Sequence, residues 1–263
     1  MEPLNLPTPI NPSDLEDDDE LAEEGDLENL EFPNSVIFGP PGHGKTSFTM
    51  KAPDPEWWDY ENSTDVLPDR IRLEEGRVFK LNKTPNPHEE TLKLLKTIPQ
   101  RGHKTVIIDS STSMLDKFLL QRMRKIETET RGRRSRYEPL FQDYRHCTGL
   151  MREIFYELAM APVNVIFIAH ELHVYEKQDD GTDKLLQIRP ELTPRVELIL
   201  RRLVSLIAYL ESSYNTRGER KVKLVVNPGY NKIVAKNRLR IQGAFLENPT
   251  WEELFDRNRP DVS

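Results

Sequence analysis

The sequence predicts an α/β fold with a mostly parallel central sheet and helices on both faces. Short runs rich in β-branched and aromatic residues alternate along the chain with segments of helical periodicity. The runs at 105–109 and 163–169 are almost continuously apolar, which is typical of central strands covered on both faces. Because strands and helices alternate throughout, we expect one domain over 32–263 rather than separate all-α and all-β units.

The elements follow from these patterns and from the proline positions. Expected strands are 35–38, 57–61, 77–82, 104–111 and 163–170, followed by a polar excursion at 176–184. Expected helices are one from Lys45 that the prolines at 53 and 55 stop, 88–97 closed by Pro99, 114–160 interrupted near "TRGRRSRYEP", and 194–212. The segments "KVKLVVNP" and "KIVAKNRLRI" are expected to form an antiparallel tail.

Charge is distributed unevenly over the 263 residues, whose net charge is −7. Residues 1–31 hold twelve Asp or Glu and no Lys or Arg, so the remaining residues carry 37 basic against 32 acidic side chains. The Pro-rich, acidic segment 1–31 has no sustained apolar face, and we expect a disordered acidic tail. Two interpretations stay open: a solubilising tail, or a tail that competes with nucleic acid for a basic surface.

Cysteine content and hydropathy restrict the compartment. Cys147 is the only cysteine, which excludes an intrachain disulfide framework and fits a reducing interior. No apolar run approaches the roughly 18 residues that a membrane helix needs. The acidic start does not resemble a secretory signal. We therefore expect a cytoplasmic protein with no membrane association.

The stretch "NSVIFGPPGHGKTS", residues 34–47, contains the spacing of a phosphate-binding loop between an expected strand and an expected helix. Its glycines let backbone N–H groups converge on anionic oxygens. Lys45 can reach the β- and γ-phosphates, and the Thr46 hydroxyl is suited to Mg²⁺. We expect ATP and Mg²⁺ as cofactors. The loop residues are Gly39, Pro40, Pro41, Gly42, His43, Gly44, Lys45, Thr46 and Ser47.

Two carboxylates are expected to complete the site. Asp109 ends the apolar strand "VIID" and is placed to hold the Mg²⁺ shell. An AAA-type motor usually carries Glu directly after this Asp, but here the position is Ser110. Glu61, at the end of the second strand, is the replacement we expect to activate water. In one class of ATPases that second strand lies next to the first in the sheet.

Glu61, "IIDSS" and "VIFIAH", in this order, resemble the RecA/RadA-like P-loop ATPases. The resemblance is closest to small phage-encoded single-strand annealing or recombination proteins, whose second strand ends Asp-x-Glu as Asp59-Tyr60-Glu61 does here. "TPRVELILRRLVSLIAYLE" is similar to the Pro-Arg-Val segment of RadA, and "VAKNRLRI" is similar to its Lys-Asn-Arg motif. In RadA that motif continues with Phe-Gly, whereas here Leu239 and Arg240 follow. The likeness covers 32–254 and implies a RecA-like P-loop NTPase core.

The resemblance also implies roles for individual residues and for assembly. In a homo-oligomeric ring or filament, Lys236 and Arg238 would reach the γ-phosphate of a neighbouring protomer and neutralise transition-state charge. His170, at the end of its strand, stands where the family places a polar sensor. With Lys45 and Glu61, these residues make up the expected catalytic set. A phage-encoded protein would act in the host cytoplasm.

Nucleic acid is expected at two segments. Residues Arg131, Arg133, Arg134 and Arg136 lie beside Tyr137, which combines phosphate-neutralising cations with a ring that can stack on a base. The second segment, 171–190, carries Lys177, Lys184 and Arg189 amid several acids and is a weaker signal. The expected partners are single-stranded DNA and a single-strand-binding protein.

Three functions compete at this point. The first is a DNA-dependent ATPase of recombination, annealing or repair on single-stranded DNA. The second is a P-loop nucleoside or small-molecule kinase, whose lid arginines the segment 131–136 could represent. The third is an interaction module that binds ATP without turnover. The Asp-x-Glu and the "AKNR" segment favour the first.

Overall fold

A computed structural model describes residues 33–178, 181–239 and 241–255, all within one compact unit that spans 31–263. The expected acidic tail at 1–31 lies outside the described residues. Among the residues that are described, no helix combines the length and apolarity needed to cross a bilayer.

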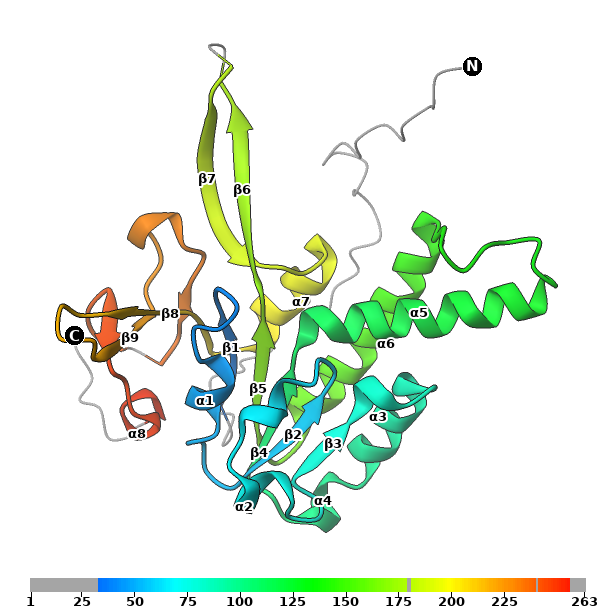
Figure 1. The fold of residues 1–263 in the computed structure, drawn as a ribbon, viewed down its shortest axis with the longest axis horizontal. Helices are drawn as coiled ribbons and strands as arrows, with labels where there is room; N and C mark the ends of the chain where they lie inside the picture. The colour runs from blue at the N-terminus through cyan, green and yellow to red at the C-terminus, as the bar shows by residue number, and fades with distance from the viewer. Residues whose placement is uncertain (1–32, 179–180, 240, 256–263) are drawn as a thin grey trace. The chain divides into compact units, whose positions relative to one another are not determined.

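The central sheet has the order β11-β9-β8-β1-β5-β4-β2-β3, of which the strands from β9 to β3 are labelled in Figure 1, and β10 also pairs with β8. All neighbours from β8 to β3 are parallel, whereas β9, β10 and β11 pair antiparallel. The predicted mostly parallel sheet is confirmed. The strands are β1 (Asn34–Phe38), β2 (Pro55–Asp59), β3 (Val78–Lys80), β4 (Thr105–Asp109), β5 (Asn164–Ala169), β8 (Leu206–Tyr214), β9 (Arg220–Val225), β10 (Lys236–Asn237) and β11 (Phe245–Glu247).

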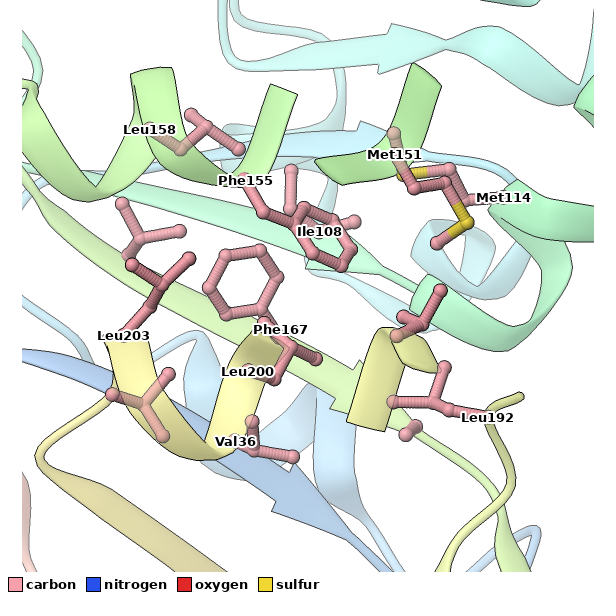
Figure 2. Packing of buried hydrophobic residues seen from close by; sticks show 14 of the residues in the cluster. Val36, Ile108, Met114, Met151, Phe155, Leu158, Phe167, Leu192, Leu200 and Leu203 are labelled. Atoms are coloured by element: carbon pink, nitrogen blue, oxygen red, sulfur yellow. The ribbon is translucent and has the colours of Figure 1, made fainter. Parts of the chain in front are cut away.

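Alternate residues of the central strands enter two separate apolar clusters, one on each face of the sheet. In the larger cluster Phe155 of one covering helix packs edge-on against Phe167 of β5, with ring centroids 4.7 Å apart (Figure 2). Ile107 and Trp57 belong to the opposite cluster. The predicted helices on both faces are thus confirmed. The helices are α1 (Lys45–Thr49), α2 (Asp69–Arg72), α3 (Pro87–Lys96), α4 (Ile98–Arg101), α5 (Ser111–Glu129), α6 (Phe141–Met160), α7 (Pro194–Leu203) and α8 (Trp251–Phe255).

The segment expected as a polar excursion is instead a two-stranded hairpin. Strands β6 (Glu171–Lys177) and β7 (Asp183–Pro190) pair antiparallel and form their own sheet. The hairpin continues from β5 after His170 and projects away from the central sheet (Figure 1). Nearly all of its residues are exposed or half-buried, so the hairpin has no buried face whose alternation could predict its strands.

Two other expectations need correction. The helix expected over 194–212 ends at Leu203, and its apolar second half is strand β8, which pairs parallel with β1. A short apolar run does not distinguish a buried strand from a buried helix, which explains the error. The helix expected over 88–97 corresponds to α3, and Pro99 lies in the first turn of the next helix, α4, where its missing N–H costs nothing. Finally, β2 pairs with β4 and β3 and is not next to β1.

Candidate functional site

The residues expected to carry chemistry meet at one edge of the sheet. In the parallel registers Asp59 lies opposite Asp109, Asp109 opposite Ile168, and Phe38 opposite Ala169. The residues that follow these strand ends therefore share this edge. They are the phosphate-loop residues after β1, Glu61 after β2, Asp109 at the end of β4 and His170 after β5. Ligands of open α/β sheets bind at this carboxyl edge.

The loop between β1 and α1 has the backbone that a phosphate cradle requires. Gly39, Gly42 and Gly44 all have positive φ angles. A β-carbon on Gly39 would lie 2.2 Å from the carbonyl oxygen of Leu210 in β8, so only glycine allows this approach. The Nζ of Lys45 donates to the carbonyl oxygens of Gly39 at 2.7 Å and Pro40 at 2.9 Å. Burial lowers the pKa of Lys45, opposed by the nearby carboxylates Asp109, Glu61 and Glu171.

Thr46 and Asp109 lie together as a Mg²⁺ site requires. The hydroxyl of Thr46 donates to Oδ2 of Asp109 at 2.8 Å, across 63 residues of sequence. Burial raises the pKa of Asp109 to about 6, although the hydrogen bond from Thr46 favours the ionised form. A buried carboxylate of this kind is stabilised by a cation. Mg²⁺ takes few protein ligands and keeps water and phosphate oxygens, so this pair fits it. No larger cluster of metal-ligating residues occurs in the described ranges.

Asp59 builds the turn that carries Glu61. Its fully buried carboxylate accepts the N–H groups of Glu61 at 3.0 Å and Asn62 at 2.6 Å. The Nζ of Lys80 donates to the same carboxylate at 2.9 Å. Burial would raise the pKa of Asp59, but the hydrogen bonds from Thr64 and Lys80 outweigh it and lower the pKa. The Asp of the Asp-x-Glu is therefore a structural residue.

Glu61 contacts His170, which the sequence placed at a separate strand end. Oε1 of Glu61 lies 2.5 Å from Nε2 of His170. Their side chains remain 31% and 25% exposed, so water has access to the pair. Burial would raise the pKa of Glu61, but the hydrogen bonds from His170 and from Ser110 and Ser113 outweigh it and lower the pKa. The hydrogen bond to Glu61 raises the pKa of His170, against the effect of burial. The hydrogen bond between the two side chains therefore favours the charged form of each group.

The first turn of α5 holds this pair in place, a role that the sequence did not suggest. The hydroxyl of Ser113 donates to Oε1 of Glu61 at 3.3 Å, and Thr112 accepts the backbone N–H of His170 at 3.2 Å. Ser110, at the position of the missing Glu, caps α5 by accepting the N–H of Ser113 at 3.2 Å. The run Ser110-Ser111-Thr112-Ser113 after a strand is an N-cap signal that could have been recognised.

Lys236 and Arg238 do not join this edge. Lys236, in β10, pairs with Ile207 near the start of β8. The N–H of Arg238 donates to the carbonyl oxygen of Ser205, the residue before β8. That start is aligned with Ser35, at the opposite end of β1 from the phosphate loop. The side chain of Lys236 donates to the carbonyl oxygen of Arg201. These two cations are therefore placed away from the site of their own protomer.

The arginine segment between α5 and α6 divides into two kinds of residue. Arg134 binds the fully buried carboxylate of Asp143, whose other oxygen accepts from Arg122 at 3.0 Å. Arg134 therefore belongs to an internal ion pair and is half-buried, and its expected contact with DNA stays a prediction. Residues Arg131, Arg133, Arg136 and Tyr137 are exposed, and the guanidinium of Arg136 lies 5.0 Å over the ring of Tyr137. The 19-residue helix α5 separates them from Asp109 by about 28 Å.

One of the cations expected in the hairpin has an internal partner. Arg189 binds Glu197, a buried carboxylate in the first turn of α7. Lys177 and Lys184 remain exposed on opposite strands of the hairpin.

Comparisons with known proteins give one family and a similar solved structure. No curated protein matches the chain. A KaiC-like protein from the archaeon Pyrococcus horikoshii OT3 is similar in structure, with a TM-score of 0.40 and 10% identity over 73% of this chain and 78% of that one. Residues 32–239 match the AAA_24 family, described as an AAA domain. The chain belongs to this AAA-domain family.

Proposed function

We propose that this protein is a DNA-dependent ATPase of the RecA/RadA type that acts on single-stranded DNA in recombination, annealing or repair. The observation that carries the hydrolytic part is the contact between Glu61 and His170 beside Thr46 and Asp109. A lowered pKa keeps Glu61 ionised at neutral pH, so its carboxylate is available as a proton acceptor.

Each residue of the site then has a defined task. Backbone N–H groups of the loop and the ammonium group of Lys45 bind the phosphates. To do so, Lys45 gives up its hydrogen bonds to the carbonyl oxygens of Gly39 and Pro40 and donates to phosphate oxygens instead. Thr46 and Asp109 would hold Mg²⁺, which neutralises phosphate charge when bound. Glu61 orients a water and accepts its proton. His170 stabilises the ionised carboxylate before the proton transfer, and its hydrogen bond with Glu61 weakens when Glu61 becomes protonated.

Two features support DNA as the partner. The exposed Arg131, Arg133 and Arg136 offer cations for phosphates beside Tyr137, a ring on which a base can stack. The β6–β7 hairpin, which carries Lys177 and Lys184, begins directly after His170. A change in the hydrogen bond between Glu61 and His170 could therefore alter the position of the hairpin. A homo-oligomeric ring or filament, with Lys236 and Arg238 at a neighbouring site, and a single-strand-binding protein are part of the same proposal.

Phosphate release in the presence and absence of single-stranded DNA tests the function. We expect Mg²⁺-dependent release of phosphate from ATP that single-stranded DNA accelerates, and its loss in Lys45→Ala, which lacks the cation of the loop. Lys51→Ala, an exposed lysine just beyond α1, is the matched control and should behave like wild type.

The outcomes separate the alternatives. Phosphoryl transfer to a nucleoside without free phosphate would identify a kinase. Tight ATP binding with no turnover, with or without DNA, would identify an ATP-binding interaction module. Equal ATP binding by folded Lys45→Ala and wild type would contradict the assignment of the loop itself.

A further inference from the structure

The outer wall of the phosphate loop is formed by the β8–β9 hairpin. Besides the close approach of Leu210 to Gly39, the backbone N–H of Ser212 in β8 donates to Nδ1 of His43 at 2.9 Å. His43 is thus held as the tautomer with its proton on Nε2. A histidine within the loop is thereby fixed by a strand more than 160 residues later in the chain.

Arg220, the first residue of β9, lies against the same loop. A β-carbon on Gly44 would fall 2.3 Å from Nη2 and 3.0 Å from Cζ of Arg220, so the guanidinium rests directly on Gly44. Gly44 also has a φ of 90° and directly precedes Lys45. The left-handed backbone conformation therefore favours glycine at this position, and the absence of a side chain lets the guanidinium approach the backbone of the loop.

The hydrogen bonding of Arg220 leaves most of its capacity unused. Its Nη2 donates to the neutral hydroxyl of Ser212 at 3.3 Å, and no ion pair of Arg220 occurs among the described residues. The side chain is exposed. A guanidinium has five donors arranged to match phosphate oxygens and forms its strongest hydrogen bonds with anions.

We propose that Arg220 is a second phosphate-binding cation, acting on the nucleotide of its own protomer. Lys45 is the buried cation of the loop, and Arg220 is the exposed cation that covers Gly44 from the hairpin. This inference rests on the proposed function, because it requires a nucleotide in the loop. It assigns the hairpin to nucleotide binding and favours ligands with a di- or triphosphate over those without phosphate.

Calorimetric titration with Mg-ADP and with the slowly hydrolysed analogue Mg-ATPγS tests the proposal. Loss of one charge-assisted hydrogen bond corresponds to roughly a ten- to hundred-fold weaker affinity. We expect a loss of this size in Arg220→Gln and partial recovery in Arg220→Lys. Arg217→Gln, an exposed arginine in the turn of the same hairpin, is the matched control and should stay within about two-fold of wild type.

A salt series and thermal melting of the free protein separate a phosphate contact from a brace for the loop. If Arg220 contacts phosphate, the affinity of wild type falls more steeply with salt than that of Arg220→Gln, and the melting temperatures agree. A lower melting temperature with an unchanged salt slope would assign Arg220 to bracing and overturn the proposal. Affinity of Arg220→Gln equal to wild type would also overturn it, without touching the proposed function. Failure of wild type to bind either nucleotide would instead overturn the proposed function.

Discussion

Nε2 of His170 lies 2.5 Å from Oε1 of Glu61, so these residues join the ends of β5 and β2 across the end of the intervening strand β4. Asp109 ends β4 between them. Glu61, the proton acceptor that we propose, is thus hydrogen-bonded to His170, the residue that directly precedes the β6–β7 hairpin. A change in the charge of Glu61 would therefore alter its hydrogen bond with His170, the residue directly before β6.

Glu61→Gln should retain ATP binding and lose turnover. The amide has nearly the shape of the carboxylate but is a poor base, and loss of a general base lowers the rate by roughly 10²–10⁴-fold. Phosphate release under saturating Mg-ATP measures the effect, with nucleotide affinity determined in parallel. Glu89→Gln, an exposed position on α3, is the control. A rate within a few-fold of wild type would transfer the role to another residue.

His170→Leu, which has no hydrogen-bond donor in its side chain, should move the acid limb of the pH–rate profile to higher pH. The hydrogen bond from His170 lowers the pKa of Glu61, so its removal raises that pKa, and a higher pH is then needed to ionise the base. Two other charged groups act on the imidazole in wild type: Lys45 lowers the pKa of His170 and Glu191 raises it. Turnover measured between about pH 4.5 and 8 in wild type and variant checks this. Coincident acid limbs would show that Glu61 is not the titrating base.

The chemistry at each strand end could be predicted, but the contacts between strand ends could not. Loop spacing and strand ends identify Lys45 and Asp109, because a parallel sheet puts its carboxyl ends at one edge. The contact of Glu61 with His170 joins residues 109 positions apart and depends on the strand order, which the sequence does not contain. For the same reason β2 was expected beside β1.

Burial and strand pairing explain two further features that the sequence did not reveal. Arg134 has the same composition signal as its exposed neighbours, and only the buried position of Asp143 makes it part of an internal ion pair. Arg220 was missed because nothing local distinguishes it. It reaches Gly44 only because residues 206–214 form a strand rather than the continuation of a helix.

Asp59→Asn should lower the free energy of unfolding and also reduce turnover. The substitution removes the charge that Lys80 neutralises and weakens the turn that positions Glu61. Loss of a hydrogen-bonded buried charge of this kind costs about 1–3 kcal/mol. Urea unfolding measures the first effect and phosphate release the second. Asp69→Asn, whose ion pair with Arg72 is at the surface, should change stability by less than about 0.5 kcal/mol. An unchanged midpoint in Asp59→Asn would contradict the structural role.

The arginine segment should separate by function when its members are replaced. Arg131, Arg133 and Arg136 changed to Ala together should leave the fold and basal ATPase intact and weaken binding of single-stranded DNA. Removal of each phosphate-binding cation should reduce the slope of log K against log salt by roughly 0.7. Fluorescence anisotropy with labelled oligonucleotides over a salt series gives this slope. Arg134→Ala should instead lower the melting temperature, because it removes one of the two arginines that neutralise the buried carboxylate of Asp143 in the described residues. Unchanged DNA binding by the triple variant would remove the segment from the DNA site.

Lys236→Ala and Arg238→Ala should each reduce hydrolysis without weakening nucleotide binding by the isolated protomer. Lys236 in β10 and Arg238 just after it lie beside the start of β8, at the opposite end of the sheet strands from their own phosphate loop, so any action on ATP would be on the nucleotide of a neighbour. Mixing Lys236→Ala with Lys45→Ala protein is therefore informative. A Lys236→Ala protomer has an intact loop, and a Lys45→Ala neighbour supplies the missing cation, so mixed assemblies should regain part of the wild-type rate. Phosphate release over a series of mixing ratios, with co-assembly verified by size-exclusion chromatography, measures the recovery. An absence of recovery in mixtures shown to co-assemble would contradict action across an interface, because the two intact halves would then be present together without producing a working site.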